Sequence, residues 1–140
     1  MMSPDCYSLS RFLDAQIGIY SQVLRELRDG QKQSHWMWFV FPQLRGLGSS
    51  PTAQKYAIHS IDEANAYLEH PVLGARLREC TQLVNAIQGR PVDGIFSFPD
   101  NLKFQSCMTL FAEVSKETIF IDALNKYFTG ERDRKTLVFL

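Results

Sequence analysis

Apolar residues recur at helical spacing in the first part of the chain. Between Ser10 and Gly30 they step by four and three and form one stripe: Leu13, Ile17, Tyr20, Leu24 and Leu27. Ser10 is a suitable N-cap, and Gly30 suits the left-handed residue that follows a helix. The pattern predicts a helix over residues 10–30. Gly18 lowers its helix propensity and suggests that another segment approaches closely there.

Two further helices are indicated in the middle of the chain. Ser50 and Pro51 have the residue types that open a helix, and we expect this second helix to reach about Glu69. A third is predicted over residues 71–88, because the steps of four and three return there: Leu73, Leu77, Cys80, Val84 and Ile87. The turn residues Gly89 and Pro91 end it.

The last third of the chain predicts two more helices, and three segments of the whole chain are expected to be irregular or short. One helix covers residues 101–114, with Asp100 as its N-cap. The other covers residues 117–128. Residues 38–41 read as a short buried turn or strand-like piece, and residues 91–99 as a loop or extended piece. The final ten residues end apolar, so we expect the tail to dock on the fold.

The fold class that follows is mostly α. A length of 140 residues fits one domain, and the sequence shows no repeat, linker or low-complexity tract. We therefore predict a single compact domain over residues 1–140, made of about five main helices and a short aromatic-rich irregular or extended segment.

Composition and charge exclude several classes of protein. The chain has 15 basic and 15 acidic residues and a net charge of +0, which argues against a general nucleic-acid binder. It has no secretory signal and no apolar run of the roughly 18 residues that a membrane span needs. The three cysteines form neither a disulfide framework nor a metal pattern, so we expect reduced thiols in a cytoplasmic protein. We expect no metal and no cofactor, and the sequence does not set the oligomeric state.

Charge is unevenly distributed, and this points to a first candidate site. Residues 30–61 contain no acidic side chain, although they hold both tryptophans and several cations. A phosphorylated ligand with a flat ring would suit such a stretch. The candidate ligand-binding residues are His35, Trp36, Trp38 and Arg45. The alternative, which the residues leave open, is that the aromatic block is a core plug that holds helices together.

A second candidate site lies near the start of the fourth helix. Lys103, Ser106 and Thr109 are three residues apart and share one side of a helix. Lys103 and Ser106 are a base–nucleophile pair or a phosphate site, or else a solvated lysine and a hydroxyl bonded to the preceding turn. We take Asp100, Lys103 and Asp133 as candidate catalytic residues and Ser106 as a ligand-binding residue. Asp133 is also a candidate cap for the final turn.

Several long blocks resemble the domain of unknown function 1810 (DUF1810) family. They are SHWMWFVFPQLRGLGSSPTAQKYAI, EANAYLEHPVLGARLREC and IFSFPDNLKFQSCMTLF, and the similarity continues to Leu140. The resemblance implies a small, mainly helical, cytosolic domain without an established activity. This chain departs from the family pattern at Ser97, Asn101 and Cys107, where Gly, Asp and Ser are usual. If the usual Asp or Ser were catalytic, this protein would be impaired.

A label carried by some family members and a more distant resemblance also bear on the function. Some members carry the label calpastatin, but an inhibitor of that kind is a polar, disordered chain, unlike this aromatic-rich one. The spacing of several C-terminal residues is similar to the NADAR superfamily, whose members cleave N-glycosidic bonds to ribose phosphates or ADP-ribosylated bases. This chain lacks the tryptophan–glycine signature of that superfamily.

Two functions remain open at the level of sequence. The first is binding or hydrolysis of a phosphorylated, nucleotide-like small molecule, of ADP-ribose or N-glycosidic type. The second is a non-catalytic binding or protein-interaction domain whose aromatic block is structural core. The residues do not decide whether the protein is an enzyme. Convergence of His35, Arg45, Lys103 and Ser106 on one cleft with an exposed tryptophan face favours the first function, and burial of both rings favours the second.

Overall fold

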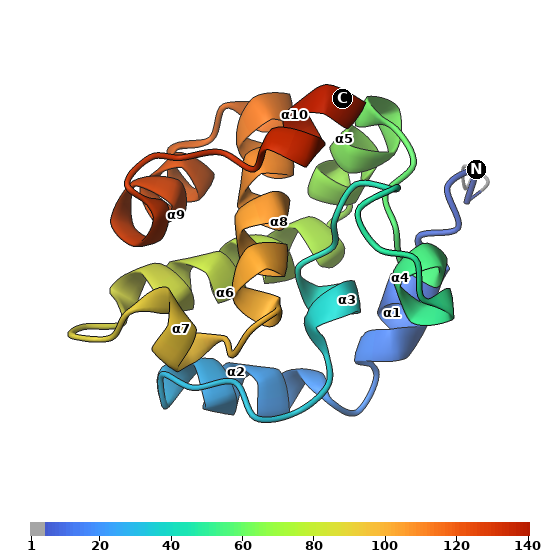
Figure 1. Cartoon of the computed structure of the whole chain (residues 1–140). Helices are drawn as coiled ribbons and strands as arrows, with labels where there is room; N and C mark the ends of the chain where they lie inside the picture. The colour runs from blue at the N-terminus through green and yellow to red at the C-terminus, as the bar shows by residue number, and fades with distance from the viewer. Residues whose placement is uncertain (1–4) are drawn as a thin grey trace.

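A computed structural model describes residues 5–140 (Figure 1). These residues form ten helices: α1 (Ser10–Gln16), α2 (Tyr20–Arg28), α3 (Met37–Val40), α4 (Pro51–Lys55), α5 (Ile61–Glu69), α6 (Leu73–Ala86), α7 (Val92–Ile95), α8 (Asp100–Ser115), α9 (Thr118–Phe128) and α10 (Arg134–Phe139). Five of them (α2, α5, α6, α8 and α9) have nine residues or more. The prediction of a mostly helical, compact domain is confirmed.

The first predicted helix is two helices, and the prediction of one continuous helix is wrong. The chain breaks after α1 because Gly18 adopts a left-handed conformation with φ of +77°, which residues with a side chain rarely adopt. A Cβ added at Gly18 meets nothing within 4 Å, so no segment approaches closely there. The predicted stripe does not continue across the break: Leu27 is fully buried, but Ile17 is 73% exposed, and the other fully buried apolar side chains here are Phe12 and Val23.

The second predicted helix also divides, into α4 and α5. Between them Ile58 is fully buried and forms a parallel β-bridge with Leu44. The Ile58 N–H donates to the Gln43 carbonyl at 2.8 Å. Ser60 then caps α5 by accepting from the Glu63 N–H. A Ser followed three residues later by Glu is a capping signature, and this signal inside residues 51–69 outweighs the apolar pattern.

Helix α8 crosses the middle of the fold and contacts α5, α7, α9 and α10 (Figure 1). Its side chains are buried on most sides, as expected of a central helix. Six are fully buried: Phe104, Cys107, Met108, Thr109, Leu110 and Phe111. The three longest helices, α6, α8 and α9, all lie within two residues of their predicted bounds. The predicted bounds of these helices are confirmed, although Asp100 is the first residue of α8 and not its N-cap.

The irregular segments differ from expectation in detail. The aromatic segment is a helical turn, α3, and the predicted loop over residues 91–99 contains the short helix α7. The tail docks as predicted: it forms α10, whose Thr136 is fully buried and whose N-cap is Asp133. None of the helices in the described part of the chain is both long and apolar enough to cross a membrane.

Candidate functional site

The two tryptophans of the aromatic block face different surroundings. Trp36 is 1% exposed, and its indole Nε1 donates to Glu26 Oε1 at 2.9 Å. Its ring packs against Phe41, with 6.1 Å between the ring centroids. Trp36 is thus part of the core. Its ring is not open to a ligand in this structure.

Glu26 is a buried carboxylate that holds the segment before α3. Its Oε1 also accepts from the backbone N–H groups of Gln33 (2.7 Å) and Ser34 (3.0 Å), and its Oε2 accepts from the Ser34 hydroxyl at 2.7 Å. Burial alone would raise the pKa of Glu26, but the hydrogen bonds from Gln33, Ser34 and Trp36 outweigh it and lower that pKa to about 2. Glu26 therefore carries a charge whose role is structural.

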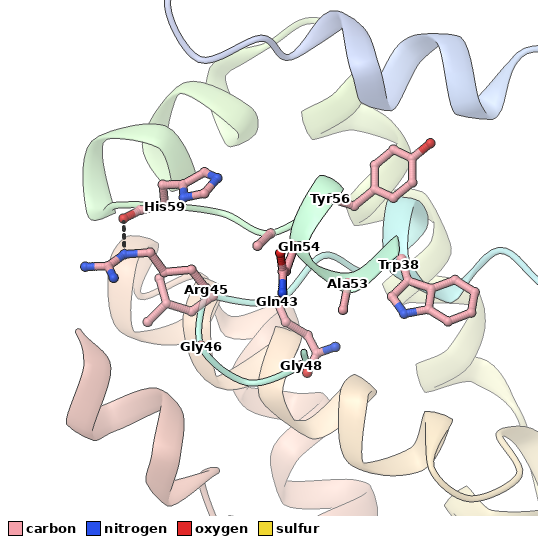
Figure 2. A pocket seen from close by; sticks show the side chains of 11 residues that line it. Trp38, Gln43, Arg45, Gly46, Gly48, Ala53, Gln54, Tyr56 and His59 are labelled. Atoms are coloured by element: carbon pink, nitrogen blue, oxygen red, sulfur yellow. Dashed lines mark hydrogen bonds between the residues drawn. The ribbon is translucent and has the colours of Figure 1, made fainter. Parts of the chain in front are cut away.

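Trp38, in contrast, is half-buried and lines a cavity of about 180 Å³. Figure 2 shows Trp38 at one end of this first cavity, Arg45 and His59 at the other, and Gln43 between them. Tyr56 from the end of α4 adds a second aromatic ring to the lining. No hydrogen bond joins the Trp38 indole to any other residue between 5 and 140. Its N–H is available to a ligand.

A second cavity of about 360 Å³ adjoins the first. The two share three lining residues, Gln43, Gly48 and Ala53. The other lining residues come from the loop before α4 and from the starts of α8 and α10: Leu47, Pro99, Leu102, Lys103, Ser106, Asp133, Arg134 and Lys135. Three of these side chains are cationic and one is a carboxylate, so the second cavity favours an anion.

Lys103 connects the two cavities chemically. Its ammonium lies 4.4 Å from the centroid of the Trp38 ring, within the range of a cation–π contact. It also lies 3.5 Å from Asp100 Oδ1, while Asp100 Oδ2 pairs with Lys32 at 2.8 Å. Lys32 in turn lies 5.2 Å from the Trp36 ring centroid. One carboxylate thus balances two lysines, each beside a tryptophan, and leaves a net positive charge.

The hydroxyl groups of α8 have local partners. Ser106 Oγ donates to the Leu102 carbonyl at 3.0 Å, and Thr109 Oγ1 donates to the Gln105 carbonyl at 2.8 Å, as hydroxyls inside helices commonly do. No hydrogen bond joins Lys103 to Ser106 within the described residues. Ser106 lines the second cavity, where its oxygen keeps a lone pair, so its ligand-binding role stays a prediction.

Asp133 lies at the edge of the second cavity and caps α10. Its Oδ2 accepts from the Thr136 N–H at 3.0 Å and from the Thr136 hydroxyl at 2.7 Å. Its own N–H donates to Thr109 Oγ1 at 2.9 Å, which ties α10 to α8. The capping role is therefore confirmed. A catalytic role for Asp133, as for Asp100, stays a prediction.

The remaining candidates divide between the cavity and the surface. Arg45 lines the first cavity, and its Nε donates to the His59 carbonyl at 3.1 Å, so the rest of its guanidinium remains available. His35 is exposed and lines neither cavity. The predicted convergence on one cleft is therefore only partial: Arg45 lines the first cavity, Lys103 and Ser106 line the second, and His35 lines neither.

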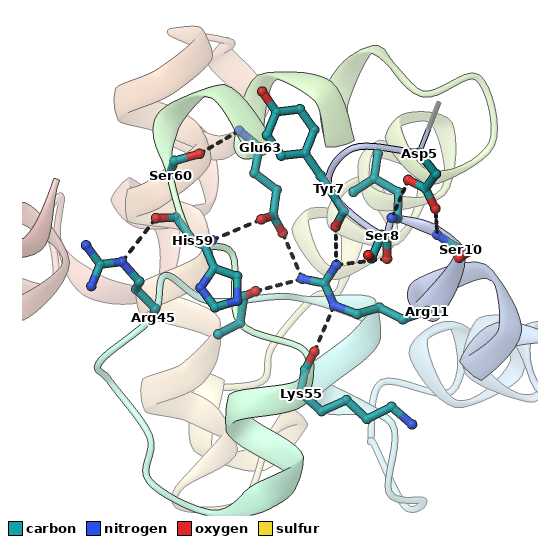
Figure 3. Close-up of polar contacts among 12 residues, drawn as sticks. Asp5, Tyr7, Ser8, Ser10, Arg11, Arg45, Lys55, His59, Ser60 and Glu63 are labelled. Atoms are coloured by element: carbon teal, nitrogen blue, oxygen red, sulfur yellow. Dashed lines mark hydrogen bonds and ion pairs between the residues drawn. The ribbon is translucent and has the colours of Figure 1, made fainter. Parts of the chain in front are cut away.

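A charged cluster holds the wall of the first cavity in place (Figure 3). Arg11 donates from Nε to the Lys55 carbonyl at 2.7 Å and from Nη2 to the Ala57 carbonyl at 2.8 Å. The same Nη2 pairs with Glu63, a buried carboxylate, at 2.8 Å. Arg11 thereby ties the segment between α4 and α5, which supplies Tyr56 and His59 to the cavity, to α1.

Four lining residues of interest were not among the predicted site residues: Gln43, Tyr56, Arg134 and Lys135. Gln43 and Tyr56 lie in the acid-free stretch, so their region was indicated although their roles were not. For Arg134 and Lys135 in α10, the sequence predicted only that the C-terminal tail docks on the fold. Nothing in the spacing says that it docks beside α8, because that contact is long-range.

Cysteines and departures from the family pattern lie outside the two cavities. Burial raises the pKa of the Cys80 thiol to about 12 and that of Cys107 well above its usual value, so both are core residues, as predicted. Asn101 donates to Asp93 Oδ1 at 3.3 Å and lines neither cavity. No group of three His, Cys, Asp or Glu residues among the described ones could hold a metal ion.

Comparison with known proteins gives a family and a structural relative. The family model described as "Protein of unknown function (DUF1810)" matches residues 6–140. The crystal structure of the conserved hypothetical protein Rv1873 from Mycobacterium tuberculosis is 54% identical and has a TM-score of 0.96, covering 97% of this chain and 98% of that chain. The search of curated proteins finds no match. Neither description mentions the NADAR superfamily, so that similarity stays a prediction. The chain belongs to the DUF1810 family.

Proposed function

We propose that this protein binds a phosphorylated, nucleotide-like small molecule across the two adjoining cavities. The flat ring lies beside Trp38 and Tyr56 in the first cavity, and the phosphate lies beside Lys103, Arg134 and Lys135 in the second. The observation that carries the proposal is the position of Lys103, whose ammonium is 4.4 Å from the Trp38 ring centroid and lines the cationic cavity. One cation therefore contacts both halves of such a ligand.

The sizes of the cavities favour this division of the ligand. Small-molecule sites usually measure about 300–1,000 Å³. The first cavity, at about 180 Å³, is too small for a whole ligand of that class and suits a ring alone. The second, at about 360 Å³, has room for the sugar and phosphate.

The acid-free stretch has a physical role in this proposal. Arg45 has no carboxylate partner among residues 5–140, so its charge faces the cavity and the solvent. The carboxylate nearest Lys103 is Asp100, and Lys32 already neutralises it from the other side. An entering phosphate therefore meets uncompensated positive charge, which favours its binding and speeds its encounter.

ADP-ribose and nucleoside phosphates are the ligands to test first, and N-glycosidic cleavage is the reaction to test. Both oxygens of Asp100 already pair with lysines, whereas only Oδ2 of Asp133 accepts hydrogen bonds within the described residues. Asp133 is therefore the better candidate to stabilise positive charge that develops at an anomeric carbon. The products of such a cleavage would be a free base and a ribose phosphate, which chromatography separates.

The binding proposal is tested by thermal unfolding with a panel of ligands. We expect AMP, ADP and ADP-ribose to raise the melting temperature by several degrees, since a ligand at a hundred times its Kd adds about 2.7 kcal/mol. Adenosine and pyrophosphate, which each carry half of the recognised groups, should raise it less. A panel without any shift at millimolar concentrations would overturn the proposal.

A matched pair of lysine variants separates the site from general charge effects. Lys103→Gln removes the shared cation, and we expect it to abolish the ligand shift. Lys116 forms a similar pair with Glu113, three residues away at 3.4 Å, at the far end of α8. Lys116→Gln should keep the ligand shift, because Lys116 lines neither of the two cavities. Equal shifts in both variants would contradict the assignment of the site.

A second candidate function rests on an exposed apolar strip. Four consecutive C-terminal residues, Leu137, Val138, Phe139 and Leu140, are between 38% and 77% exposed. Burial of Trp36 also agrees with an aromatic block that is partly structural core. A protein-interaction domain explains both features, but it does not explain the cationic cavity beside Trp38. The ligand panel decides between the two functions.

A further inference from the structure

Gln43 occupies the junction of the two cavities. Of the three residues that line both, Gly48 has no side chain and Ala53 has only a methyl group. Gln43 is therefore the one polar side chain that both linings share. A ligand that extends from one cavity into the other must pass its amide.

The backbone around Gln43 is held firmly. Its carbonyl accepts from the Ile58 N–H at 2.8 Å, and the Arg45 N–H donates to the Ile58 carbonyl at 2.8 Å. These two bonds form the isolated bridge between Leu44 and Ile58, both of which are buried. A fixed backbone sets the direction in which the Gln43 side chain leaves the chain, which keeps its amide at the junction of the two cavities.

The amide of Gln43 has no partner of its own. No hydrogen bond joins it to another residue between 5 and 140, whereas the nearby Gln54 donates through Nε2 to the Ser49 carbonyl at 2.9 Å. Gly48 and Ala53 also approach closely, since a Cβ added at Gly48 would lie 2.7 Å from the Ala53 Cβ. The junction thus combines a tight wall with one uncommitted donor and acceptor.

We propose that Gln43 is a specificity-determining residue that hydrogen-bonds the sugar hydroxyls of a ribonucleotide. The inference rests on the proposed function. In a nucleotide the sugar joins the ring to the phosphate. A ligand with its ring beside Trp38 and its phosphate beside Lys103 therefore places the sugar beside Gln43. A primary amide can donate to one hydroxyl and accept from its neighbour, so the site prefers ribonucleotides to their 2′-deoxy forms.

The test compares AMP with 2′-deoxy-AMP by isothermal titration calorimetry. We expect the wild-type protein to bind AMP about five- to tenfold more tightly, the worth of one hydrogen bond. Gln43→Met keeps the length of the side chain and removes the amide. It should weaken both ligands, and AMP more than 2′-deoxy-AMP, which has only one of the two hydroxyls to lose, until the two ligands bind equally.

Gln105→Met is the matched control, because that amide lines neither cavity and donates to the Glu131 carbonyl at 2.9 Å, and it should keep the wild-type preference. If Gln43→Met fails to fold, the ligand-side comparison on wild type still decides. Equal binding of both nucleotides to wild type, with binding that depends on Lys103, overturns this inference and leaves the proposed function intact. A wild-type preference that Gln43→Met retains also overturns it. Absence of binding by either nucleotide removes both proposals.

Discussion

The ring of Trp36 is 1% exposed and its indole donates to Glu26 at 2.9 Å, whereas Trp38, two residues further on, is half-buried and lines a cavity. Each ring has a lysine beside it, and both lysines pair with Asp100. The buried region around Trp36 satisfies its polar groups within the protein. Among residues 5–140, the open region around Trp38 leaves the Trp38 indole N–H, the Gln43 amide and the two α10 cations, Arg134 and Lys135, without hydrogen-bond or ion-pair partners.

This difference explains why one aromatic block gave two hypotheses. A buried hydrogen-bonded ring stabilises the fold, because its donor would be costly to leave unpaired. A half-buried ring beside uncommitted polar groups is available to a ligand. The block is core on one side of α3 and cavity wall on the other, and each hypothesis describes one side.

The largest expected effect separates the two rings by their contribution to stability. Trp36→Ala should lower the free energy of unfolding by about 3–5 kcal/mol, because it leaves a cavity in the core. Trp38→Ala should cost only about 1 kcal/mol, since part of its ring already faces solvent. Urea denaturation followed by circular dichroism measures both. Equal losses would contradict the distinction between the buried and open regions.

The next effect concerns the charge that supports the buried region. The pKa of Glu26 is lowered from 4.5 to about 2 in the folded protein, so its stabilisation is fully present above pH 4.5. It is lost as the pH falls through about 2, and it amounts to roughly 3 kcal/mol. Glu26→Gln should therefore be less stable than wild type at pH 7. The melting temperatures of the two proteins should converge as the pH falls. A difference that stays constant between pH 2 and pH 7 would refute this.

The smallest effect compares the two lysines that share Asp100. The Lys32 side chain is 8% exposed and lies 2.8 Å from Asp100, while that of Lys103 is 20% exposed at 3.5 Å. Lys32→Met should cost about 1–2 kcal/mol, because Asp100 loses its shorter and less exposed ion pair. Lys103→Met should cost less than about 1 kcal/mol. Chemical denaturation of both variants checks the order, and a reversed order would place the structural lysine in the open region.

The sequence predicted the long helices well and the breaks between short ones poorly. Apolar spacing alone does not show a break: the steps of four and three run past Gly18, yet Ile17 is exposed and Phe12 and Val23 are the buried residues on its two sides. Local backbone chemistry decides where a helix stops. The left-handed Gly18 and the Ser60 cap both interrupt patterns that seen alone favour one helix.

The candidate site was predicted in its residue types more than in its arrangement. The acid-free stretch contains Trp38 and Arg45, and both line the first cavity. The partners of that region, Asp100 and the cations of α10, come from elements far along the chain, and no spacing in the sequence reveals such contacts. His35 was predicted as a site residue because it lies next to the tryptophans in sequence. In the structure it lies on the surface, outside the cavities.

Tryptophan fluorescence during a titration with AMP tests the central claim most directly, namely that Trp38 and not Trp36 faces the ligand. The wild-type protein and Trp36→Phe should both show a change in emission that saturates with AMP. Trp38→Phe, in which the buried Trp36 is the remaining indole, should show none. A saturable change that survives in Trp38→Phe, or one that is lost in a folded Trp36→Phe, would contradict the account.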